Sequence, residues 1–189
     1  MISFFQGVRL VATKNTKREK MITLRINERS YDIIKDFAAN HGLSVNAYLN
    51  SIIDSQAEWF IPISSYDAVT VPKSMMAILF GMASKEGLEE LAKRWAAEAK
   101  NIILLSGGEL GIESALDFAR RVSKYFMGTD ARVTAPGNNA IYAVIRHDAG
   151  ENFSYFISQA FDQLFQNMKI RAFIDHDATT VFVKIENTG

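Results

Sequence analysis

Residues 21 to 27, Met-Ile-Thr-Leu-Arg-Ile-Asn, alternate between apolar and polar side chains from Ile22 onward. Successive side chains of a β-strand point to opposite faces, so this alternation predicts a strand that is buried on one face only. The apolar and the polar face hold three residues each: Ile22, Leu24 and Ile26, and Thr23, Arg25 and Asn27.

Two helices are expected directly after this strand. Asn27 is a suitable N-cap for a helix that extends to about His41 and ends at Gly42, and Ser44 is a suitable N-cap for a second helix. Apolar residues recur at helical spacing in both: Tyr31, Ile34, Phe37, Ala38 and His41 in the first, and Val45, Tyr48, Leu49, Ile52 and Ile53 in the second.

A single strand with two short helices has no ladder partner and too small a core to stand alone. A second copy of the chain would supply both. Two such strands, paired antiparallel across a twofold axis, would place their apolar faces over four helices and leave their polar faces on an exposed ribbon. A two-stranded ribbon of this kind fits the major groove of DNA.

This segment resembles the ribbon-helix-helix family of Arc and MetJ type repressors, without gaps from about Met21 to Ile53. The family pattern usually has proline at Asn27, an aliphatic residue at Ser30 and an acidic residue at Ala47, where this chain departs from it. The residues that carry the resemblance are Ile22-Thr23-Leu24-Arg25-Ile26-Asn27, Ile34, Phe37-Ala38, Gly42, Ser44 and Leu49-Asn50-Ser51-Ile52-Ile53.

The resemblance implies an obligate dimer whose ribbon reads base edges in the major groove. Arg25 could bind guanine bidentately and Asn27 could pair with adenine, with Thr23 beside them, although an ordinary solvated strand face is the alternative. The start of the second helix, at Ser44, Val45 and Asn46, is implied to offer its backbone amides to a phosphate.

The basic residues are concentrated near the N-terminus. The whole chain has 21 Lys and Arg against 21 Asp and Glu, but residues 9 to 29 hold seven basic and two acidic residues. We expect residues 1–20 to be a flexible basic arm in which Lys17, Arg18 and Lys20 follow the DNA backbone, unless this charge run is only a solvated tail.

The composition is that of a folded protein: 189 residues, of which 48% are hydrophobic and 22% charged. The absence of cysteine excludes disulfides and thiolate metal sites and is compatible with a reducing compartment, so a cytoplasmic location is expected. No apolar run approaches the roughly 18 residues of a membrane span, and we expect no membrane association.

The sequence pattern changes after Phe60. We expect the ribbon-helix-helix domain to cover residues 21–60, a linker to cover 61–72 and an α+β domain to cover 73–189. The pattern predicts helices at about 74–84, 87–100 and 112–127. Residues 102–105 fit either a short buried strand or the end of the preceding helix. A β-α-β-β unit with helices on one face of a small sheet is predicted at 140–147, 151–168, 170–174 and 180–186.

No catalytic constellation is recognisable, and neither an enzyme activity nor a cofactor is expected. His147-Asp148 and Asp175-His176-Asp177 bring histidine next to carboxylates, but turn chemistry explains them better than a metal site. The Met-rich helix near Met75 and the Phe-rich helix 151–168 could line an effector pocket, although plain core is the favoured interpretation.

These observations predict a dimeric, sequence-specific, DNA-binding transcriptional regulator. Its C-terminal domain would serve oligomerisation, up to a tetramer, or the sensing of a small-molecule effector. The alternative is a protein-interaction module, such as an antitoxin-like or scaffold dimer, in which the ribbon-helix-helix serves dimerisation only. A ligand-binding signalling protein without a DNA role is a third, weaker interpretation.

Overall fold

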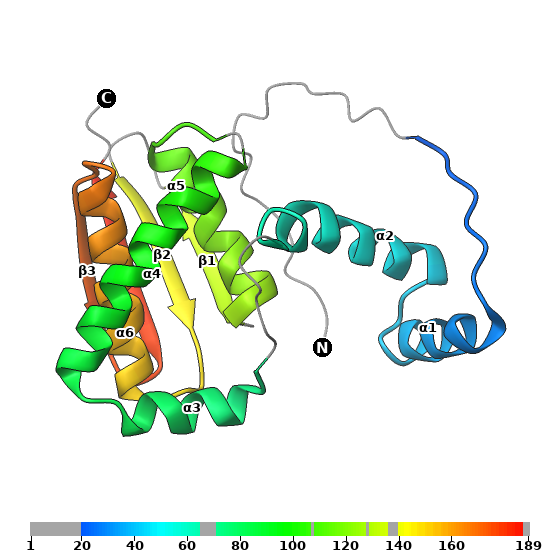
Figure 1. Ribbon diagram of the computed structural model, residues 1–189, viewed down its shortest axis with the longest axis horizontal. Coiled ribbons are helices and arrows are strands. Elements are labelled where there is room, and N and C mark those ends of the chain that lie inside the picture. Colours follow the sequence, from blue (N-terminus) through cyan, green and yellow to red (C-terminus); the bar gives the residue numbers. More distant parts are fainter. Residues whose placement is uncertain (1–19, 65–70, 107, 128, 136–139, 187–189) are drawn as a thin grey trace. The chain divides into compact units, whose positions relative to one another are not determined.

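The computed structural model of the protein describes residues 20–64, 71–106, 108–127, 129–135 and 140–186 (Figure 1). The chain forms two compact units, Met1–Ile53 and Asp54–Gly189. Residues 1–19, which include most of the expected basic arm, and residues 65–70 of the expected linker lie outside the described residues.

The N-terminal unit contains the two predicted helices, α1 (Glu28–Asn40) and α2 (Val45–Ser55). The Asn27 side chain accepts a hydrogen bond from the Ser30 amide at 2.9 Å and begins α1. Gly42 then adopts a left-handed φ of 67°, which glycine tolerates without strain, and Leu43 N–H donates to the Ala38 carbonyl at 2.9 Å. The predicted caps and the glycine stop are confirmed.

Residues 20–27 form neither helix nor strand in the single chain. A strand exists through hydrogen bonds to a neighbouring strand, and the described part of one chain offers this segment no such neighbour. The ribbon, which requires a second copy, therefore stays a prediction.

The C-terminal unit is a mixed structure of helices and one sheet, which confirms the α+β class. Its strand 140–146, helix 151–167 and strands 172–176 and 180–186 correspond to the predicted β-α-β-β unit. Its elements are the π-helix η1 (Gln56–Phe60), α3 (Lys73–Met82), α4 (Lys85–Leu105), α5 (Ile112–Arg121), the π-helix η3 (Val122–Met127), β1 (Asp130–Thr134), β2 (Ala140–Arg146), α6 (Glu151–Asn167), β3 (Ala172–His176) and β4 (Thr180–Glu186).

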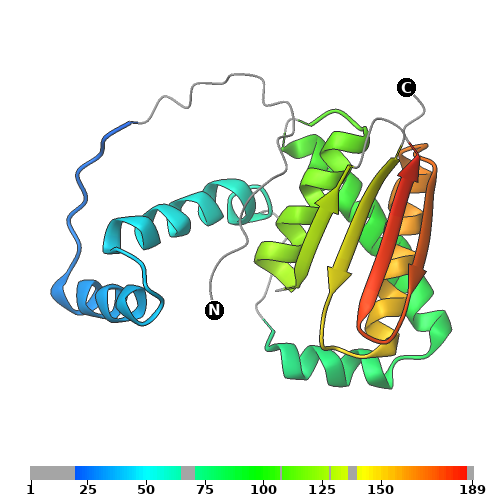
Figure 2. The ribbon, with the colours of Figure 1, turned by 180° about the vertical axis from the view of Figure 1, so that it is seen from behind.

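The four strands form an antiparallel sheet in the order β1-β2-β4-β3. Val144 of β2 lies opposite Phe182 of β4, which lies opposite Asp175 of β3. Helix α6 lies against one face of this sheet, and α4 packs against α6 on the same side. Figure 2 views the opposite face, on which no described helix of this unit lies. The prediction of helices on one face is confirmed.

The sequence interpretation missed β1. Ala131 and Val133 alternate with polar residues and pair with β2, so the unit is β-β-α-β-β rather than β-α-β-β. Five residues with two apolar positions give a weak signal, and the pairing with β2 is what makes them a strand. Residues 102–105, which fitted either a strand or a helix end, are the end of α4.

The core of the C-terminal unit lies between α4, α6 and the sheet. Ala92, Ala96 and Ala99 of α4 are almost fully buried, and such small side chains allow the backbones of packed helices to approach closely. The Phe-rich α6 is core, as expected, with Phe153 and Phe161 almost fully buried.

The Met-rich helix differs from the expectation of plain core. Met75, Ile78, Leu79 and Met82 of α3 are exposed, whereas Met76 and Phe80 pack against the core. Residues all round α3 are apolar, so the sequence pattern alone could not identify its buried face.

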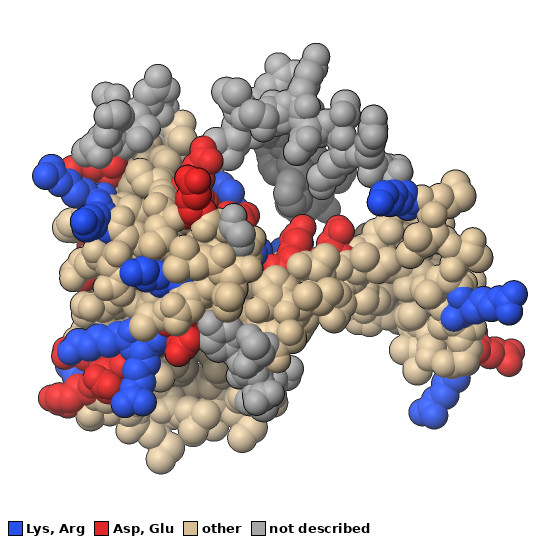
Figure 3. All heavy atoms as spheres, turned by 45° about the horizontal axis from the view of Figure 1, so that its top comes forward, with Lys and Arg blue, Asp and Glu red and all other residues tan. Residues whose placement is uncertain are grey.

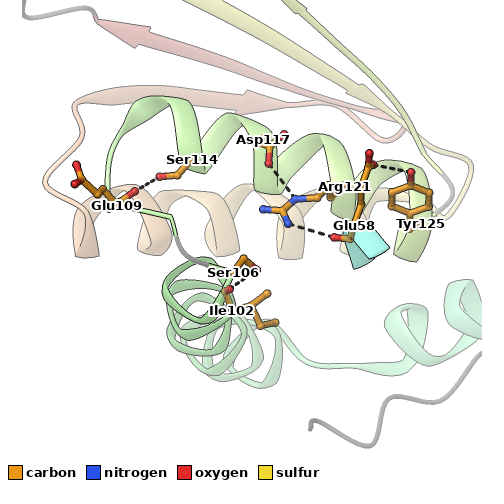
Figure 4. Close-up of polar contacts among 8 residues, drawn as sticks. All are labelled: Glu58, Ile102, Ser106, Glu109, Ser114, Asp117, Arg121 and Tyr125. Carbon is orange, nitrogen blue, oxygen red and sulfur yellow. Dashed lines mark hydrogen bonds and ion pairs between the residues drawn. The ribbon is translucent and has the colours of Figure 1, made fainter. Parts of the chain in front are cut away.

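The C-terminal unit also includes residues that the sequence interpretation assigned to the first domain and the linker. Trp59 and Ile63 are buried in its core, and the Trp59 and Phe118 rings lie 6.2 Å apart. Glu58 accepts a hydrogen bond from the Tyr125 hydroxyl at 2.9 Å, and its backbone carbonyl accepts one from Arg121 at 3.2 Å (Figure 4). These contacts fix η1 on α5 and η3.

None of the helices in the described part of the chain combines the length and the apolar character that a bilayer crossing needs.

Candidate nucleic-acid interface

The N-terminal unit contains an open groove of about 1310 Å³ between the extended segment 20–27 and the two helices. Its lining brings together both faces of the predicted strand with the apolar face of α2. The lining residues are Lys20, Met21, Ile22, Leu24, Arg25, Ile26, Glu28, Tyr31, Val45, Asn46, Leu49, Asn50 and Ile53.

The apolar residues of this unit are largely exposed. Among its described residues, Ala38 alone is buried, while Ile22 and Leu24 are 70% and 58% exposed. On the face drawn in Figure 3, residues other than Lys, Arg, Asp and Glu occupy most of the surface of this unit, with charged side chains of both signs at its margin. Exposed apolar side chains gathered in one groove mark an interaction site.

The two helices are held together by a stack of aromatic rings. The Phe37 ring lies 4.0 Å from the His41 ring within α1 and its C-cap, and 4.7 Å from the Tyr48 ring of α2. His41 Nδ1 lies 2.8 Å from the Phe37 carbonyl oxygen. These ring contacts connect α1 with α2 beside the open groove.

Of the predicted base-reading residues, Thr23 and Arg25 are exposed. Arg25 forms no ion pair with any residue that the structure describes, and its guanidinium keeps its donors for a ligand. Asn27 is different, because its Oδ1 already accepts the Ser30 amide, and a base would have to share this oxygen with the start of α1. Bidentate pairing with adenine needs both groups.

The start of α2, where a phosphate site is predicted, is a capped helix terminus. The Ser44 hydroxyl accepts a hydrogen bond from the Ala47 amide at 3.1 Å, and Val45 and Asn46 follow in the first turn. First-turn amides have no partner within their own helix, and the helix dipole favours a negative charge there. No acidic residue lies in this turn to compete with a phosphate.

The basic arm is only partly described. Lys20 is exposed and lines the edge of the groove, whereas Lys17 and Arg18 lie outside the described residues. The groove also includes Tyr31 and Asn50, which the sequence interpretation did not assign to a site. Asn50 lies one helical turn after Asn46, so helical spacing could have indicated it.

The imidazole of His147 in the C-terminal unit makes two hydrogen bonds. Its Nδ1 accepts from the Ala149 amide at 3.3 Å, so its Nε2 carries the proton and donates to the buried Ser154 Oγ at 2.7 Å. Burial lowers the pKa of His147 below its usual value. This tautomer cannot deprotonate Ser154, and the pair is structural.

The other histidine motif forms a turn. Asp177 Oδ1 accepts the Thr179 amide at 2.8 Å, and this backbone hydrogen bond lowers the pKa of the carboxyl. The described residues contain no group of three His, Asp or Glu side chains placed to hold a metal ion.

Comparison with models of known protein families and with curated proteins finds no match to this chain.

Proposed function

We propose that the protein is a dimeric, sequence-specific, DNA-binding regulator of transcription that uses residues 21–53 as a ribbon-helix-helix. The observation that carries the proposal is the open groove that the described residues of the N-terminal unit form. It is lined by Ile22, Leu24 and Ile26 of the alternating segment and by the apolar face of α2.

A second copy of the same segment fits this groove chemically. Pairing of two 20–27 segments across a twofold axis satisfies their backbone amides and carbonyls and covers both apolar faces. Burial of a Leu or Ile side chain contributes about 1.5–3 kcal/mol, so the exposed Ile22 and Leu24 of two chains favour such a dimer.

Pairing leaves the other face of each segment outward. That face carries Thr23 and Arg25 of each chain, which are exposed, with donors suited to base edges. The capped start of α2, which lacks acidic residues in its first turn, provides amides for a flanking phosphate. A module for dimerisation alone would need only a solvated face here, and DNA binding distinguishes the two.

The test is fluorescence anisotropy of the protein on its own upstream DNA and on a scrambled duplex across a salt series. Arg25→Ala should lose about 1–3 kcal/mol on the upstream DNA, or roughly 5–150-fold in affinity, and little on the scrambled duplex. Lys93→Ala, at an exposed position of α4, removes one positive charge elsewhere and should bind like the unmodified protein.

Equal losses of Arg25→Ala on both duplexes would contradict base reading by the ribbon. Failure of the dimeric protein to bind either duplex at low salt would favour the protein-interaction alternative, in which the ribbon-helix-helix only dimerises.

A further inference from the structure

Helix α3 has two apolar faces, of which the C-terminal unit uses one. Its inner face packs against the core through Met76 and Phe80. Its outer face carries a stripe at helical spacing in which every side chain is more than half exposed: Met75 at 54%, Ile78 at 62%, Leu79 at 59% and Met82 at 81%. A helix that is apolar all round is normally buried all round, whereas the described residues of the single chain leave this outer stripe uncovered.

The inner contacts hold α3 in a defined orientation. The Phe80 ring lies 4.9 Å from both the Phe153 and the Phe156 rings of α6. Asn152 Nδ2 donates to the Phe80 carbonyl at 3.0 Å and to the Ala83 carbonyl at 3.4 Å, which caps the end of the helix. The outer stripe is therefore presented by a packed and capped element rather than by a fraying one.

The chemistry of α3 restricts what can cover the stripe. Lys73, at the first position, is the one charged residue of the helix, and its Nζ lies 3.9 Å from Asp148. Nucleic acids and acidic lipid surfaces are recognised by clustered basic residues, which α3 does not have. An uncharged apolar surface suits a partner of the same character, and two copies of α3 can approach without repulsion between like charges.

We propose that the outer stripe of α3 packs against the outer stripe of a second copy of this chain. This inference rests on the proposed dimer in one respect, because the stripe is small. Four partly exposed side chains amount to roughly 400 Å² per copy, about half of a standard interface. A second interface of this size becomes effective when the N-terminal units already keep two chains at a high local concentration.

A twofold axis makes the position of contact specific. Ile78 and Leu79 lie at the middle of the stripe. In a parallel pair each meets its own counterpart, and in an antiparallel pair centred on the stripe Ile78 meets Leu79, one residue from its own counterpart. The chain contains no cysteine, so one substitution supplies a single thiol at a chosen position.

The experiment is oxidative cross-linking of full-length Ile78→Cys, with Lys93→Cys as the control for random collision at an exposed position of α4. We expect Ile78→Cys to form the disulfide-linked dimer at least about tenfold faster than Lys93→Cys, because disulfides need Cα atoms within about 7 Å. Adding Leu79→Glu to Ile78→Cys should remove this advantage, since it places two buried like charges in the contact.

Light scattering of the same samples separates the possible failures. If the chain is dimeric but Ile78→Cys and Lys93→Cys cross-link at equal rates, the α3 contact is wrong and the N-terminal dimer is unaffected. An advantage of Ile78→Cys that persists with Leu79→Glu overturns the contact as well. A chain that is monomeric at micromolar concentration overturns both the contact and the dimer on which it rests.

Discussion

The Asn27 side-chain oxygen accepts a hydrogen bond from the Ser30 amide at 2.9 Å, so a residue of the predicted DNA-reading face also begins α1. This couples the outward face of the segment to the helix that supports it. Thr23 and Arg25, which do not cap a helix, are left as the residues with all of their polar groups available for a ligand.

Asn27 variants should separate capping from DNA binding. Asn27→Ala should destabilise the protein by about 1 kcal/mol, because the Ser30 amide loses its acceptor. Asn27→Asp keeps the acceptor and adds a negative charge at a helix start, so stability should be retained while DNA affinity falls. Far-ultraviolet circular dichroism during urea unfolding measures the first effect and anisotropy the second. Equal stability of the two variants would show that the cap is unimportant.

Leu24→Asp should dissociate the proposed dimer. The side chain is 58% exposed in the single chain and would be covered in the ribbon pair, so a carboxylate there opposes pairing in both copies. Sedimentation or light scattering should show a shift from dimer to monomer at micromolar concentration.

Thr23→Asp is the matched control, because it places the same carboxylate on the other face of the same segment. It should remain dimeric and lose DNA binding through repulsion from phosphates. Dissociation by Thr23→Asp, or dimers of Leu24→Asp as stable as those of the unmodified chain, would refute the assignment of the two faces.

His147 should make the C-terminal unit less stable as the pH falls below about 6.5. Burial lowers the pKa of the folded imidazole, so protons bind the unfolded chain more readily and the free energy of unfolding decreases through this range. At higher pH both states are neutral at this site and the contribution is absent. Below the lowered pKa no further loss occurs.

Urea unfolding between about pH 7.5 and 5.5 tests this, since carboxylates stay charged over most of that range. Both tryptophans of the chain, Trp59 and Trp95, belong to the C-terminal core, so their fluorescence reports on this unit. His147→Gln should flatten the dependence, and His176→Gln is the control for loss of an imidazole. An unchanged slope in His147→Gln would contradict the assignment.

Ala96→Leu should destabilise the C-terminal unit by about 1–3 kcal/mol or more. Ala96 is 0% exposed in the core, where added methylene groups have no space. Ala97→Leu makes the same change at the next, exposed position of α4 and should stay within about 0.5 kcal/mol of the unmodified protein. Tryptophan fluorescence during urea unfolding compares the two, and similar losses would indicate that helix propensity rather than packing is responsible.

Features that depend on a few neighbouring residues were predictable from the sequence. Asn27, Gly42 and Ser44 act within one helical turn of their own positions, so the ends of α1 and α2 follow from local chemistry. The hairpin turn at Asp177 is explained in the same way, because its carboxylate binds the amide two residues further on.

Features that depend on distant residues were not predictable. The strand β1 needed β2 as its partner. Trp59 follows α2 in the sequence yet is buried with Phe118, so it belongs to the C-terminal core. Arg25 and Val45 are twenty residues apart but line one groove.

The sequence by itself determined the alternating segment, the capped helices and the α+β class. Periodicity and capping depend only on residues that are close together along the chain. Tertiary structure alone decided which apolar faces are covered. Met76 and Phe80 of α3 face the core while Ile78 and Met82 face solvent, and Ile22 and Leu24 stay exposed although their pattern suits burial. Burial of an apolar face depends on which surfaces meet in space, whereas the periodicity of the sequence specifies only that such a face exists.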